Sequence, residues 1–141
     1  MTFDDVMVNR RKWVEFLKQP HLRKEKWSLA SPNHEENFRR CCIGHACVAF
    51  GFEFDFEETL NQDVTKAVGL RDDEGAGYRI SRNHFSTSHE LEFDGNKHPG
   101  LTHINDSTGA SPQEIGEYLE SVINGGHKTP FMDREEWEAA Q

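Results

Sequence analysis

The sequence contains no long hydrophobic run. Only 35% of its 141 residues are hydrophobic and the mean hydropathy is -0.81. No stretch approaches the roughly 20 consecutive apolar residues that cross a bilayer. The first residues place acids before a basic cluster and include no apolar signal segment. These absences predict a cytoplasmic protein with neither a membrane anchor nor a signal peptide.

Cysteine is scarce and crowded into one place. Cys41, Cys42 and Cys47 are the three cysteines of the chain. An odd number of neighbouring thiols is a poor disulfide framework, because a link within one helix would constrain almost nothing. The sequence therefore favours reduced thiols, as in a cytoplasm.

Basic residues are outnumbered, with 16 Lys and Arg against 25 Asp and Glu and a net charge of -9. General binding to duplex DNA, which needs a cationic face, is therefore not expected. The charge is uneven, however, because residues 1–40 hold nine basic and six acidic residues. We favour the basic stripe from Arg10 to Lys26 as the solvated side of a helix. The alternative is a contact for a phosphate, a nucleotide or an acidic partner.

Two segments predict helices at the heart of the fold. In residues 3–19 apolar side chains recur at spacings of three, four and seven, which is typical of an amphipathic helix, and Pro20 ends the pattern. The stretch 38–50 is the most apolar in the chain and predicts a central helix that ends at Gly51. Gly44 is a poor helix former and predicts the close approach of another backbone.

Shorter patterns fill the space between these helices. Residues 20–38 are interpreted as an irregular connection that packs Trp27 and Leu29 onto the core. Alternation and capping signals predict further elements in the middle of the chain: a strand over 52–56, a helix over 61–68 ended by Gly69, and strands over 78–85 and 91–93.

The clearest helix signal begins at Ser111. Ser111 and Glu114 have the spacing of a capping box, and Pro112 occupies the first helical position. The pair Gly125 and Gly126 is expected to end this helix.

Together these patterns predict an α+β fold. Residues 1–126 are expected to form a single, mainly helical globular domain with a small antiparallel sheet. The cysteine-bearing helix is expected at its centre, between the first and last helices. Residues 127–141 are expected to form an acidic C-terminal tail that docks through Phe131 and Trp137.

Four stretches, taken in order, resemble a known group of proteins. They are RKWVEFLK, RRCCIGHACVAFG, LNQDVTKAVGLRDDEGAG and GLTHINDSTGASPQEIGEYLE. In this order they are similar, over about residues 10 to 123, to a widespread group of small, mostly uncharacterised proteins of tailed bacteriophages and prophages. The resemblance implies a phage accessory protein in the host-cell cytoplasm and no established catalytic activity. His45 and Pro112 depart from the group, which commonly has a small apolar residue and a phenylalanine there.

The cysteines raise the hypothesis of a thiol nucleophile. Cys41 or Cys42 would open the central helix, where a thiol pKa is lowered. The base and its orienting group would come from polar residues further along: His84, His89, His98, His103, Asn105 and Asp106. The apolar surroundings favour the alternative, in which each cysteine packs as a small hydrophobe. A cysteine-dependent hydrolase, and an enzyme in general, is therefore the less favoured interpretation.

The same segment contains metal-ligand residue types. Cys41 and His45, at i and i+4, could share one ion, whereas Cys42 and Cys47 would point about 140° apart on a helix. A second pair of ligands would have to come from the histidines of the middle region. Core packing is the favoured interpretation, and no cofactor is predicted.

The Asn105–Asp106 pair is expected in a loop before the capped helix. Asx side chains in such loops usually bond to nearby backbone N–H groups. The alternative is a ligand contact close to a helix N-terminus, where an anion is stabilised.

The leading functional hypothesis is a binding protein that contacts a host protein or a small ligand and so modulates host defence or metabolism. This hypothesis predicts an acidic patch on one face. A second hypothesis is sequestration of an anionic nucleotide, which requires five guanidinium groups to converge: Arg10, Arg11, Arg39, Arg40 and Arg82. The sequence leaves open whether the chain forms a homo-oligomer and which partner it binds.

Overall fold

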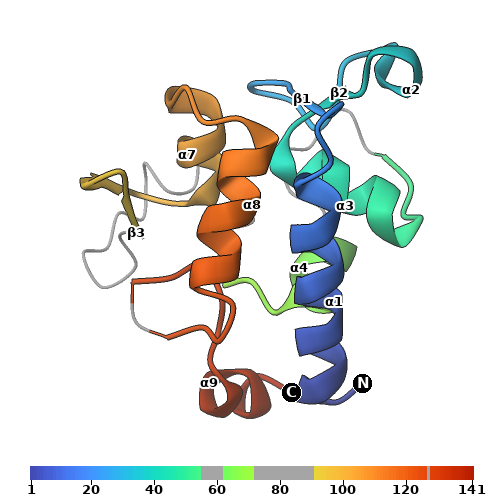
Figure 1. The fold of residues 1–141 in the computed structure, drawn as a ribbon. Helices are drawn as coiled ribbons and strands as arrows, with labels where there is room; N and C mark the ends of the chain where they lie inside the picture. Colours follow the sequence, from blue (N-terminus) through green and yellow to red (C-terminus); the bar gives the residue numbers. More distant parts are fainter. Residues whose placement is uncertain (55–61, 72–90, 127) are drawn as a thin grey trace.

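The computed structural model describes residues 1–54, 62–71, 91–126 and 128–141. It is a mainly helical α+β fold, as predicted (Figure 1). Its elements, in chain order, are α1 (Phe3–Leu17), β1 (Arg23–Lys24), α2 (His34–Asn37), β2 (Arg39–Arg40), α3 (Cys42–Phe50), α4 (Gln62–Val68), β3 (Leu91–Phe93), β4 (Asn96–His98), α7 (Leu101–Ser107), α8 (Pro112–Ser121) and α9 (Arg134–Ala139). The strand predicted over 78–85, with Arg82 and His84, and also His89, lies outside the described residues.

Helix α1, not α3, occupies the centre. It contacts α3, α4, α8 and α9, and in Figure 1 it runs between α8 and α3. The prediction of a central α3 is wrong because that helix has nine residues, whereas α1 has 15 and is long enough to reach all four partners. A capping box between Thr2 and Asp5 begins α1.

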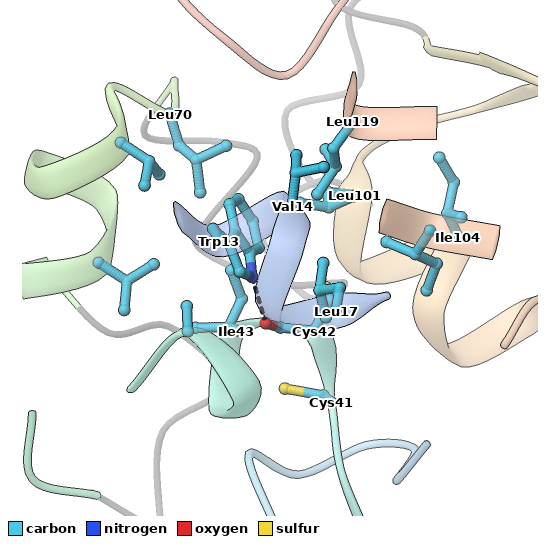
Figure 2. Close-up of a cluster of buried hydrophobic side chains, with 14 of the residues drawn as sticks. Trp13, Val14, Leu17, Cys41, Cys42, Ile43, Leu70, Leu101, Ile104 and Leu119 are labelled. Atoms are coloured by element: carbon cyan, nitrogen blue, oxygen red, sulfur yellow. Dashed lines mark hydrogen bonds between the residues drawn. The ribbon is translucent and has the colours of Figure 1, made fainter. Parts of the chain in front are cut away.

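The main core forms where α1 meets α3, α4, α7 and α8 (Figure 2). Trp13 is fully buried, and its indole Nε1 donates a hydrogen bond to the Cys42 carbonyl oxygen at 3.0 Å. The ring of Phe131 meets the Trp13 ring edge-on. The cysteine segment therefore packs as part of the core, on the helix that α1 covers.

Helix α3 begins four residues later than the apolar pattern predicts. Phe38 adopts a left-handed backbone conformation with φ 57°, and Arg39–Arg40 is extended as β2. Cys41 is the N-cap of α3, because its Sγ accepts a hydrogen bond from the backbone N–H of Gly44 at 3.3 Å. Gly51, with φ 75°, ends the helix as predicted.

Two small sheets complete the fold. The predicted antiparallel sheet is the hairpin β3–β4, whose turn residues Asp94 and Gly95 both have positive φ, as a tight hairpin turn requires. The parallel pair β1–β2 aligns Arg23 with Arg39 and Lys24 with Arg40, within the segment predicted to be irregular. Residues 52–54 form no strand, and the rest of that predicted strand lies outside the described ranges.

The start of α8 and the end of α4 follow the predicted signals, whereas the end of α8 does not. Ser111 and Glu114 form the predicted capping box of α8. Gly69, with φ 65°, follows α4. Helix α8 stops at Ser121, ahead of the predicted glycine stop, and turns lead to Gly125.

The segment 128–141 packs against the helices. Phe131 is fully buried and pairs with Leu70 in an isolated β-bridge. Trp137, on α9, meets the ring of Phe3 edge-on at a centroid distance of 5.8 Å. Both aromatic residues therefore dock as predicted, and the two termini of the chain lie near each other (Figure 1).

Among the helices that the structure describes, none combines the length and apolarity needed to cross a membrane.

Gly44 provides the sharpest test of this packing. A Cβ at this position would overlap the carbonyl oxygen of Leu29, which accepts a hydrogen bond from the Cys41 N–H at 2.9 Å. We expect Gly44→Ala to lower the free energy of unfolding by about 2 kcal/mol or more, because backbone cannot move aside as a side chain can. Urea denaturation measures the change. Gly109→Ala, at a site with open space, is the control and should shift stability by less than about 0.5 kcal/mol.

A candidate binding surface at the parallel strand pair

The three thiols are placed for packing rather than for nucleophilic attack. Burial raises the pKa of Cys41 to about 12 and that of Cys47 to about 11, and it raises the pKa of Cys42 well above its usual value. Desolvation therefore outweighs the two backbone N–H groups that lower the Cys41 pKa. His103, the proposed base, makes its ring hydrogen bond to His98, with 3.0 Å between the Nδ1 atoms.

His45 uses both ring nitrogens inside the protein. Its Nε2 lies 2.8 Å from the carbonyl oxygen of Arg23 and its Nδ1 lies 3.5 Å from a guanidinium nitrogen of Arg40. Burial lowers the pKa of His45 to about 4, so the ring is neutral at pH 7 and donates from Nε2. In the part of the chain that the structure describes, no three His, Cys, Asp or Glu side chains are grouped to hold a metal ion.

Arg10 is a core residue. Its guanidinium donates to the carbonyl oxygens of Val68 at 2.6 Å, Met132 at 2.8 Å and Ile123 at 2.9 Å. It also lies over the rings of Phe3 and Phe131. Burial lowers its pKa to about 10, which leaves it charged at neutral pH.

The arginines predicted to share a ligand do not converge. Arg40 is buried, and it donates from Nε to the Nδ1 of His34 at 2.8 Å, in a network separate from that of Arg10. Arg11 and Arg39 are exposed. The structure therefore does not assemble the predicted nucleotide site from its four described arginines.

Asn105 and Asp106 lie at the end of α7 rather than in a loop, and both are buried. The Asn105 Oδ1 accepts from the Cys42 N–H at 3.1 Å, and its Nδ2 donates to the carbonyl oxygen of Glu25 at 2.9 Å. The Asp106 Oδ1 accepts from the Trp27 N–H at 3.0 Å. The pair therefore holds the chain after β1 against the start of α3.

Three of the predicted site residues act on one segment, 23–27. His45 holds the carbonyl of Arg23, and Asn105 and Asp106 hold the backbone at Glu25 and Trp27. The Lys24 Nζ adds a hydrogen bond to the carbonyl oxygen of Thr108 at 2.7 Å, just after α7. His45, Asn105 and Asp106 were candidate site residues in the sequence, and in the structure they position the segment 23–27.

Six exposed side chains gather on and beside this segment, and we call them the aromatic–basic surface: His21, Arg23, Lys26, Trp27, Phe38 and Arg39. Arg23 and Arg39 are partners in the β1–β2 register, so both lie on the exposed side of the strand pair. The rings of His21 and Phe38 meet edge-on at 4.6 Å. In Figure 1 the strand pair lies at the opposite end of the molecule from the termini.

Trp27 and Phe38 are unusual in two respects. Trp27 is 58% exposed and Phe38 is 37% exposed, so the prediction that Trp27 packs on the core is wrong, although Leu29 is fully buried. Both exposed aromatic residues adopt the left-handed backbone conformation, with φ of 68° and 57°. That conformation costs about 1 kcal/mol or more for a residue other than glycine. The sequence carries no signal for it.

The aromatic–basic surface is locally cationic. Residues 21–27 contain three Lys or Arg and a single acid, Glu25. Within the described ranges, no carboxylate lies at ion-pair distance from the side chains of Arg23, Lys26 or Arg39. The nearest acids along the chain otherwise are on the neighbouring helix α2, at positions 35 and 36.

Two hollows lie elsewhere on the molecule. A groove of about 310 Å³ between β3 and α8 is lined by four carboxylates and two rings: Glu92, Phe93, Asp94, Glu114, Glu117 and Tyr118. The four carboxylates make the lining of this groove acidic. A cleft of about 650 Å³ lies between α4 and α9, and the Arg71 guanidinium on its wall already binds the Glu136 carboxylate and the Gly126 carbonyl oxygen.

Comparisons with models of known protein families, with curated proteins and with solved structures find no match to this chain. The resemblance to phage proteins therefore stays a prediction.

Arg10 and Arg11 form a matched pair for testing the structural role of the buried guanidinium. Arg10→Met leaves at least three carbonyl oxygens without their charged donor, so we expect the free energy of unfolding to fall by about 3 kcal/mol or more. Arg11→Met removes an exposed charge and should change it by less than about 0.5 kcal/mol. Urea denaturation distinguishes them, and equal stability of the two variants would contradict the assignment.

The buried imidazole of His45 predicts a pH dependence of stability. The pKa of His45 is about 4 in the folded protein against 6.5 unfolded, so the unfolded chain binds the proton more readily. Stability is complete above about pH 6.5 and falls toward pH 4, by up to about 3 kcal/mol from this group. We expect His45→Gln to flatten this loss in denaturation measured from pH 7 to 4.5. Lys97→Gln, at an exposed site on β4, should leave the slope unchanged.

Proposed function

We propose that this chain is a small accessory protein of the phage type that acts by binding an anionic partner in the host cell through the aromatic–basic surface. The observation that carries this proposal is the pair of exposed rings, Trp27 and Phe38, held in left-handed backbone beside the exposed arginines of the strand pair. The resemblance to phage proteins supports the accessory role.

The cost of the arrangement supports a binding role. Three buried polar side chains, those of His45, Asn105 and Asp106, fix a segment whose own Trp27 faces outward. The strained backbone and the hydrogen-bond network do not bury the Trp27 side chain in the core. A loop already held in its binding conformation loses less conformational entropy when a partner docks, so the strain is offset by tighter binding.

The composition of the surface points the same way. Tryptophan and arginine are the residues that most often dominate the binding energy of interfaces. Exposed cations attract an anionic partner, and at physiological salt the field of a charge reaches about 8 Å, so acids further away than this are screened. The raised pKa values of the three thiols favour this binding role over a cysteine-dependent hydrolase.

The test is affinity capture from an extract of the bacterial host. The surface variant carries Trp27→Ala and Arg39→Glu, and the control variant carries Val8→Ala and Lys97→Glu, which remove an exposed side chain and reverse a charge elsewhere. Proteins, nucleic acids and small ligands retained by each are compared, after circular dichroism confirms folding. We expect a component that the wild type and the control retain and the surface variant loses. The proposal is contradicted if the wild type, the surface variant and the control variant retain the same components, or if the wild type retains no specific component.

A further inference from the structure

We infer that the anionic partner of the aromatic–basic surface is single-stranded nucleic acid. This inference rests on the proposed function and names the class of partner at the same site. The surface combines the two contacts that sequence-independent binding of single strands uses, which are stacking of bases on aromatic rings and ion pairing with phosphates.

The rings provide the first contact. Five large hydrophobic side chains are exposed among the described residues, and the two aromatic ones, Trp27 and Phe38, are both in the aromatic–basic surface. The aliphatic ones lie on other elements: Met1, Val8 and Val48. The exposed apolar part of this surface is therefore aromatic, and flat rings beside cations suit the stacking of planar bases together with binding of their phosphates.

The cations provide the second contact. Arg23 and Arg39 are register partners in the parallel pair, where neighbouring strands lie about 5 Å apart, and like charges on neighbouring strands repel each other. Phosphate oxygens accept from the guanidinium fork and relieve this repulsion. Lys26 adds a third cation one residue before the Trp27 ring, so a base on the ring and its phosphate can be bound together.

The requirement for a single strand follows from the same groups. Bases in a duplex are stacked on one another, and their faces are not accessible to Trp27 or Phe38. The net charge of -9 also opposes a duplex, whose two phosphate backbones would extend beyond this small cationic area. Glu35 and Glu36 on α2 repel phosphates on one side, so the strand should run from Phe38 toward Trp27 and not along α2.

The binding test uses the full chain and a fluorescein-labelled oligothymidine of about 15 nucleotides, followed by fluorescence anisotropy. Three phosphate contacts predict a loss of affinity of about 20-fold between about 50 and 200 mM salt. We expect Trp27→Ala to weaken binding at least about 5-fold. Trp27→Phe should retain most of the affinity, because phenylalanine keeps an aromatic ring on which a base can stack. Arg39→Glu should weaken binding by at least about 10-fold. The matched controls Val8→Ala and Lys97→Glu should bind as the wild type does.

A spectroscopic readout reports whether a base lies on the ring. Trp13 and Trp137 are buried, so Trp27 is the tryptophan accessible to a ligand. The oligonucleotide should quench its emission in the wild type. The Trp27→Phe variant should still bind the oligonucleotide by anisotropy, but its tryptophan emission should not be quenched. If Trp27 had a purely structural role, the oligonucleotide would not quench the emission of the wild type.

Competition separates this inference from the proposed function. Unlabelled duplex of the same sequence, and a glutamate peptide of equal charge, should each compete at least about 10-fold less well than the single strand. An oligonucleotide that does not bind, or that binds equally to Trp27→Ala, overturns the inference. If the glutamate peptide binds instead and needs Arg39, the partner is an acidic protein and the proposed function stands. If the oligonucleotide does not bind and the surface variant also captures the same components from extract as the wild type, both this inference and the proposed function are wrong.

Discussion

One buried guanidinium connects the parts of this fold. Arg10 extends from the middle of α1 and donates to the carbonyl oxygens at the end of α4, after α8 and before α9. Carbonyls at helix ends have no partner within their helix and must be satisfied from outside. Because a guanidinium carries five N–H groups in a rigid fork, a single side chain satisfies several of them at once. The long helix thereby fixes the position of its neighbours as well as packing on them.

A second polar network works at the other end of the molecule and has a different consequence. Arg40, His45, Asn105 and Asp106 are buried, and three of them bond directly to the backbone of 23–27. The bonds to this segment go to its backbone rather than to its side chains, so the segment is held in place while Trp27 stays exposed. This separation of buried support from exposed contact residues is the physical basis of the proposed binding surface.

The residues with chemically active side chains serve the fold: the cysteines pack and the Asx pair bonds to backbone N–H groups, as the favoured predictions had it, whereas the four described arginines do not converge. Arg10 and Asn105 have the functional groups of ligand-binding residues, and both use them inside the protein. Cys41 has the position of a nucleophile at a helix start, but burial sets its pKa. Residue type and spacing do not show whether a side chain faces solvent or a backbone carbonyl far along the chain. Trp27 illustrates the converse, since hydrophobicity predicts burial and a left-handed backbone turns it outward.

Periodicity and capping signals were enough to predict the local features: the helix over α1, the capping box at Ser111, the stop at Gly69, the close approach at Gly44 and the mainly helical α+β class. These depend on periodicity and on hydrogen bonds between near neighbours, which a linear pattern records. The central place of α1, the parallel pairing of β1 with β2 and the aromatic–basic surface became visible in the three-dimensional fold. Those features depend on contacts between residues as far apart as Trp27 and Asp106, and the free energy of such contacts leaves no periodic trace in the sequence.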